Sequence, residues 1–192
     1  MRRTFAATVG LALLATTACR LDARDDYLGD KDPKRFSLGH AATPAELASV
    51  NVDVSPNGAG LPPGSGTVEQ GATVYAANCA SCHGENGEGK PPYPQLIGGP
   101  KGNVDFSTDP KIPRTIGNYW PYATTLFDYV RRAMPWDRPK SLSDEEVYAV
   151  AAYVLFLNGV VGQDDVLDAQ SLPKVKMPNR DGFIPFPRSP PR

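Results

Sequence analysis

The chain has 192 residues, of which 41% are hydrophobic and 21% charged, so it is long enough for one globular domain with extensions. Its 20 prolines and 18 glycines favour a compact fold rich in loops and exclude a long helical bundle. A formal net charge of −1 gives no indication of a surface that binds nucleic acid.

Residues 1–18 have the three parts of an export signal. Arg2 and Arg3 form a basic start, residues 5–15 an apolar run, and residues 16–18 a small-residue cleavage site. The apolar run is too short to cross roughly 30 Å of hydrocarbon. We therefore predict a signal peptide and a periplasmic mature protein with 18 basic and 21 acidic side chains.

Cys19 directly follows the predicted cleavage site, and two interpretations remain open for it. Cleavage before Cys19 would allow a lipid anchor on its thiol, whereas otherwise it is an unmodified residue near the mature N-terminus. Lipoprotein signals usually place Leu three residues before the cysteine, where this chain has Thr16. We expect contact with a membrane only if Cys19 is lipidated.

Residues 19–66 are predicted to form an extended N-terminal arm without a core of its own. They are dense in charge at first and rich in small residues, Pro and Gly later. Residues 43–47 predict one short helix, with Pro44 at its first position. His40 is interpreted as a solvated surface residue rather than as a metal ligand.

The run Cys79-Ala80-Ser81-Cys82-His83 predicts covalent attachment of a haem. Its two thiols lie on one turn and can add to the two haem vinyl groups, while His83 binds the iron as the proximal ligand. The alternatives are a zinc half-site or a redox pair. Zinc needs further Cys or His ligands, and the chain has only Cys19 and His40 besides these. We therefore predict one covalently bound haem c.

Residues 67–162 are predicted to form the haem domain. A capping box of Thr67 and Gln70 begins a helix that leads into the haem motif. Residues 84–99 predict an irregular loop, in which residues 94–96 either place a carbonyl near the proximal imidazole or form a plain turn. Two more helices are expected over residues 122–133 and after a second capping box, Ser143 with Glu146.

Met134 is the predicted second axial ligand of the iron. The following Pro135 ends the preceding helix, which leaves the thioether outside regular structure. The other methionine of the mature chain, Met177, falls in residues 163–192, a Pro-rich tail that we expect to be extended rather than packed. Ligation by His83 and Met134 fills both axial positions, which favours electron transfer over catalysis at the haem.

Two further groups of residues have open interpretations. Arg114, Tyr119 and Trp120 are candidates to hold the haem propionates, although each is also typical of ordinary surface or core. A basic cluster surrounds Met134 in the sequence and is either a solvated rim or a docking patch for an electron partner. The members of this cluster are Arg131, Arg132, Arg138 and Lys140.

The order of these motifs over residues 67–160 resembles a class I cytochrome c. The resemblance implies an all-α fold in which the helix with Gly71 and Tyr75 crosses the terminal helix near Tyr153. Three segments resemble, more narrowly, the cytochrome subunit of Sox-type sulfane dehydrogenase and related sulfite dehydrogenases. These segments are residues 61–66, 129–135 and 176–183.

The narrower resemblance implies a non-catalytic subunit of an oxidoreductase complex. Such a subunit accepts electrons from a molybdenum-cofactor subunit that oxidises sulfane sulfur or sulfite, and passes them to another cytochrome. The alternative is a free-standing or lipid-anchored cytochrome c that shuttles electrons to a terminal oxidase. A five-coordinate haem enzyme or sensor is a further alternative, and it would require that Met134 does not bind the iron.

Overall fold

The computed structural model describes residues 39–100, 104–106 and 108–183. The predicted signal peptide and Cys19 lie outside the described residues. The chain divides into two units, Met1–Pro44 and Ala45–Arg192, and only residues 39–44 of the first are described. His40 belongs to that first unit and is exposed. The helices and strands described below are those of the second unit, except that α1 begins at Pro44.

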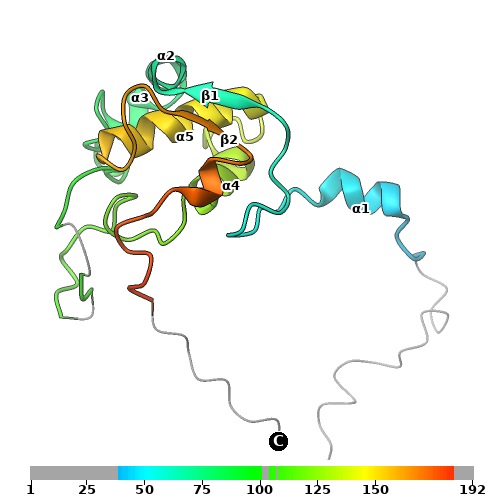
Figure 1. Ribbon diagram of the computed structural model, residues 1–192, viewed down its shortest axis with the longest axis horizontal. Coiled ribbons are helices and arrows are strands. Elements are labelled where there is room, and N and C mark those ends of the chain that lie inside the picture. The colour runs from blue at the N-terminus through cyan, green and yellow to red at the C-terminus, as the bar shows by residue number, and fades with distance from the viewer. Residues whose placement is uncertain (1–38, 101–103, 107, 184–192) are drawn as a thin grey trace, which may run out of the picture. The chain divides into compact units, whose positions relative to one another are not determined.

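The fold is helical, as predicted, and the described residues also contain a small two-stranded sheet that was not predicted (Figure 1). No helix in the described part of the chain is long and apolar enough to span a membrane. In chain order the elements are α1 (Pro44–Val50), β1 (Ser65–Thr67), α2 (Val68–Asn78), α3 (Ala80–His83), α4 (Ala123–Ala133), α5 (Asp144–Leu157), β2 (Val166–Asp168) and the 3-10 helix η1 (Leu172–Lys174).

Both predicted capping boxes are confirmed. The Thr67 hydroxyl accepts a hydrogen bond from the Gln70 backbone N–H, and the Gln70 side chain accepts one from the Thr67 N–H. Ser143 and Glu146 form the same pair of bonds at the start of α5. These bonds satisfy N–H groups that the first turn of a helix leaves without partners, so α2 and α5 begin where the sequence indicates.

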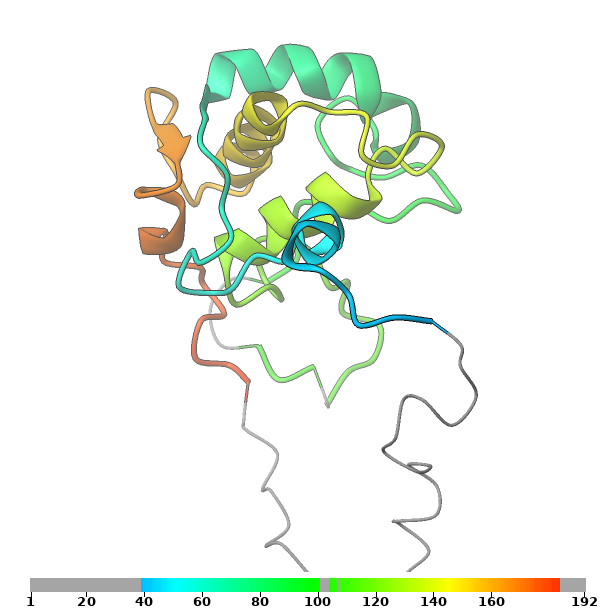
Figure 2. The same ribbon diagram turned by 90° about the vertical axis from the view of Figure 1, so that its right-hand side faces the viewer.

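The core forms where α2 and α4 pack against α5. Figure 2 shows α5 lying between these two helices. Gly71 allows the close crossing of α2 and α5, because a Cβ atom at this position would overlap the carbonyl oxygen of Ala149. One turn later the rings of Tyr75 and Tyr153 lie 5.3 Å apart, which confirms the crossing implied by the cytochrome c resemblance.

The chain beyond α5 packs against the domain, so the expectation of an extended tail is wrong for residues 166–177. β2 pairs antiparallel with β1, with Leu167 opposite Gly66. Leu167, Leu172 and Met177 are all buried in the core. Their spacing of five residues matches neither a helical nor a strand period, so a periodicity argument does not predict their burial. The domain boundaries at residues 66 and 162 remain predictions.

The last part of the N-terminal arm also packs against the domain. The backbone N–H of Val54 donates to the Asp128 carboxylate in α4 (3.1 Å), and the Tyr148 hydroxyl in α5 donates to the Pro62 carbonyl (2.9 Å). Together with β1, these contacts fix residues 54–67 across α4 and α5.

Candidate haem site

The haem motif lies at the junction of α2 and α3. Cys79 follows the last residue of α2, and the single turn of α3 brings Cys82 and His83 next to it. Both thiols are free and half-buried. Burial and the neighbouring Cys82 raise the pKa of the Cys79 thiol to about 11, so this thiol is protonated at neutral pH. The motif thus presents two thiols on one turn of the chain, as addition to two vinyl groups requires.

The imidazole of His83 is oriented by the loop that follows it. Its Nδ1 atom lies 2.8 Å from the carbonyl oxygen of Pro94. A carbonyl can only accept a hydrogen bond, so Nδ1 carries the proton and Nε2 keeps a lone pair for a metal. Of the two interpretations of residues 94–96, the structure supports the one in which a carbonyl contacts the imidazole.

Two further side chains fix the backbone around the motif. The Tyr75 hydroxyl in α2 donates to the Gly84 carbonyl (2.9 Å), and burial raises the pKa of Tyr75, so its phenol remains a donor. On the other side of the turn, the Lys90 ammonium group donates to the Ala80 carbonyl (3.1 Å). The position of His83 is therefore determined from both α2 and the loop.

Met134 follows α4 in extended conformation and is half-buried at the edge of the core. The loop after it contacts the last residue of α2, because the Arg138 guanidinium donates to the side-chain oxygen of Asn78 (2.9 Å), one residue before Cys79. The fold thus brings the loop after Met134 to the end of α2. Met177 is only 3% exposed and packs inside the core, so its thioether is not accessible to a ligand.

The three candidate propionate contacts lie in the chain before α4. The Arg114 guanidinium lies over the Phe106 and Tyr119 rings, 5.6 and 5.5 Å from their centroids. The Trp120 ring meets the Tyr129 ring edge-on at 5.7 Å. Arg114 forms no ion pair with any residue that the structure describes, which leaves its charge available to a carboxylate.

Most of the basic cluster around Met134 is engaged within the fold. Arg131 pairs with Asp144 (2.8 Å), and Arg132 pairs with Asp128 and, at 3.8 Å, with Asp53. For these two arginines the contacts support a structural role over a docking role. Trp136, two residues after Met134, was not predicted as part of the site, and 77% of its surface is exposed. An aromatic residue directly after Met-Pro was the signal that could have drawn attention to it.

The residues around the motif fit a haem. Four apolar side chains pack against the core yet remain partly accessible, so each could contact an apolar group: Cys79, Leu96, Trp120 and Met134. A haem is a flat apolar group with one carboxylate edge, for which Arg114 supplies a cation. Within the described ranges, no group of three or more His, Cys, Asp or Glu side chains could hold a separate metal ion, so the zinc alternative lacks ligands there.

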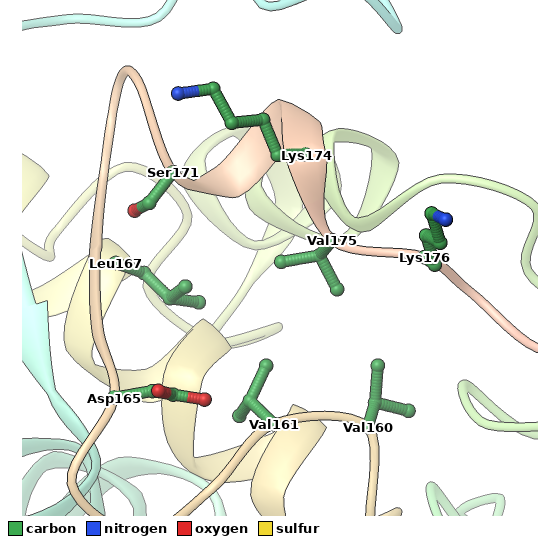
Figure 3. Close-up of a pocket in the computed structure, with 8 residues that line it drawn as sticks. All are labelled: Val160, Val161, Asp165, Leu167, Ser171, Lys174, Val175 and Lys176. Carbon is green, nitrogen blue, oxygen red and sulfur yellow. The ribbon is translucent and has the colours of Figure 1, made fainter.

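A surface hollow of about 360 Å³ lies at a different place in the fold. Figure 3 shows Val160, Val161 and Val175 around it, with the amino groups of Lys174 and Lys176 at its outer side. Its lining contains none of the haem-motif residues.

Comparison with known proteins identifies the family. Residues 68–158 match the family described as cytochrome c. A chain in the crystal structure of the sulfane dehydrogenase SoxCD from Paracoccus pantotrophus is 44% identical, with a TM-score of 0.71, over 80% of this chain and 74% of that chain. The chain belongs to the cytochrome c family. No curated protein matches this cytochrome. Membership implies haem c as the cofactor and electron transfer as the activity.

Proposed function

We propose that this cytochrome is the periplasmic electron-transfer subunit of a molybdenum-cofactor dehydrogenase for sulfane sulfur or sulfite. It accepts electrons from the molybdenum subunit and passes them to another cytochrome. The observation that carries the proposal is the extent of the match to the SoxCD chain. That match covers 80% of this chain, whereas the general cytochrome c match covers residues 68–158, so the likeness extends beyond the haem domain.

In the proposed site Cys79 and Cys82 would bind one haem c, and His83 and Met134 would ligate its iron. The haem supplies an iron that gains and loses one electron. Pro94 fixes the tautomer of His83, and the soft Met134 thioether favours the reduced iron and so raises the potential. Ligation by both side chains would leave the iron no position for a substrate, so the subunit would transfer electrons without itself being catalytic.

The propionates are proposed to lie near Arg114, Tyr119 and Trp120. The Arg114 guanidinium would balance their negative charge, and the contacts of its planar group with the Phe106 and Tyr119 rings hold it in one orientation.

One observation favours the alternative of a free-standing carrier. Residues 54–67 and 166–177 pack against this chain's own domain, so these parts of the arm and tail need no partner to be ordered. Such a carrier, free or anchored through Cys19, would pass electrons to a terminal oxidase without a stable complex.

The two functions are separated by a reduction assay with the full-length exported protein. The cytochrome is expressed with and without the molybdenum subunit of such a dehydrogenase, and haem reduction is followed by absorbance after addition of sulfite or thiosulfate. We expect copurification, and reduction only when the partner is present with its cofactor. A partner prepared without molybdenum is the matched control. Reduction by neither compound contradicts the proposal, and a monomer that reduces an oxidase unaided supports the alternative.

A further inference from the structure

The segment 177–183, which we call the brace, contacts the chain just before α4. Met177 anchors the brace in the core, with 3% of its surface exposed. Asn179 is 2% exposed, and its Nδ2 atom donates a hydrogen bond of 2.7 Å to the carbonyl oxygen of Tyr119, sixty residues earlier. Both views show the end of the described tail, in red, passing beside the chain that leads into α4 (Figures 1 and 2).

Two more side chains of the brace contact the same stretch. The Phe183 ring meets the Tyr119 ring edge-on at 5.3 Å, and the Arg180 guanidinium lies 4.2 Å from the centroid of the Tyr122 ring. Tyr119 in turn contacts the Arg114 guanidinium. The brace therefore fixes Tyr119 from its backbone and from its ring, and through Tyr119 it constrains Arg114.

The backbone of Gly182 lies directly against the Asn179 side chain. A Cβ atom at Gly182 would overlap the Asn179 amide, and the backbone of Gly182 does not have the positive φ that disfavours other residues. The amide alone thus requires glycine here. The Asn179 Oδ1 atom is buried without a hydrogen-bond partner among the described residues. A buried acceptor without a hydrogen bond lowers the stability of the fold. The hydrogen bond from Nδ2 to the Tyr119 carbonyl is therefore the interaction that offsets the cost of burying this amide.

We propose that the brace positions the chain from Tyr119 to Tyr122 at the haem, with Asn179 as the positioning residue. This role rests on the propionate site of the proposed function, and it does not depend on which protein donates electrons to the haem. When Asn179 no longer holds the Tyr119 carbonyl, Tyr119 and the Arg114 charge move away from the propionates. Loss of nearby positive charge favours the oxidised iron, so the haem potential falls.

The first test uses the isolated haem-loaded protein with Asn179→Ala. We expect the backbone amides of residues 119–120 and 122–124 to exchange hydrogen about tenfold faster, which corresponds to one lost buried hydrogen bond. The midpoint potential, measured at an electrode, shifts downward, while the haem stays attached and the red absorption band of iron–thioether ligation is unchanged. Asn57→Ala is the matched control, because its amide accepts a hydrogen bond only in an exposed turn, and it leaves exchange and potential as in the wild type.

The second test is a double-variant cycle. Gly182→Ala also lowers the potential, because its Cβ displaces the Asn179 amide, but it has no further effect when Asn179→Ala has removed that amide. Gly162→Ala is the control, since a Cβ there meets only Asp165, at 3.5 Å and beyond. Faster exchange with an unchanged potential, or additive shifts in the double variant, would overturn the positioning role. The electrode needs no partner, so failure of sulfite or thiosulfate to reduce the cytochrome leaves this result standing.

Discussion

Gly71 in α2 lies directly against the carbonyl oxygen of Ala149 in α5, with no room for a side chain between the two backbones. This contact sets the crossing that brings Tyr75 to Tyr153, and the end of α2 then places Cys79, the first cysteine of the motif. The position of the haem motif therefore depends on the absence of a side chain at Gly71, about two turns earlier in the same helix.

Gly71→Ala is expected to lower the free energy of unfolding by about 2 kcal/mol. The higher helix propensity of Ala favours the variant by about 1 kcal/mol, but overpacking costs about 1–3 kcal/mol or more, and here the obstacle is backbone, which cannot rotate away. Urea unfolding measures the difference. Gly162→Ala, at an open position, should change stability by less than about 0.5 kcal/mol. Equal effects of the two variants would contradict the close crossing.

Met134→Ala should remove the red absorption band of iron–thioether ligation and lower the midpoint potential. The expected drop is a sizeable part of the roughly 0.8 V over which axial ligands tune haem potentials. Spectroscopy and electrode titration of the isolated protein measure both changes. Met177→Leu is the control: it keeps the band and the potential, because Met177 is a core side chain that Leu replaces in volume. Loss of the band in Met177→Leu alone would reassign the ligand.

Asp128→Ala should destabilise the protein by about 2–3 kcal/mol and loosen the N-terminal arm. Asp128 is 9% exposed, accepts the Val54 N–H and pairs with Arg132, so its removal leaves the half-buried Val54 N–H without an acceptor and Arg132 with only its long contact to Asp53. Urea unfolding and the rate of proteolysis within residues 51–60 measure the two effects. Asp53→Ala should cost less than about 0.5 kcal/mol, because its contact with Arg132 is exposed and long. Equal proteolysis in both variants would argue against this anchor.

The stability of the protein should fall at alkaline pH through Tyr148. Burial, followed by the nearby Asp144 and Asp168 carboxylates, raises the pKa of Tyr148 to about 12. The folded state thus favours the neutral phenol. The contribution of protonated Tyr148 to the free energy of unfolding is complete below about pH 10 and is lost as the pH rises to about 12. Tyr148→Phe costs about 1 kcal/mol at pH 8 through the lost bond to Pro62. This gap should narrow from pH 10 to 12 in denaturant unfolding followed by circular dichroism; a constant gap would contradict the shift.

The features that were predictable from the sequence are local ones. Thr67 with Gln70 and Ser143 with Glu146 each form a complete helix start within four residues, and the structure shows both pairs of hydrogen bonds. The haem motif is equally local, since one turn of chain brings its ligating side chains together. Such patterns need no knowledge of distant contacts, because the interacting groups are neighbours along the chain.

Tertiary structure alone decided the remaining features. The pairing of Leu167 with Gly66, the burial of Met177 and the bond from Asn179 to Tyr119 join residues far apart in sequence. In the sequence, the charges of Arg131 and Arg132 are equally consistent with a docking patch and with a solvated rim. Their ion pairs with Asp144 and Asp128 exist only in the folded chain. Burial and pairing depend on which surfaces meet when the helices pack, and a linear pattern does not contain that information. The sequence by itself determined the haem motif and the helix starts, while packing determined which parts of the arm and tail belong to the domain.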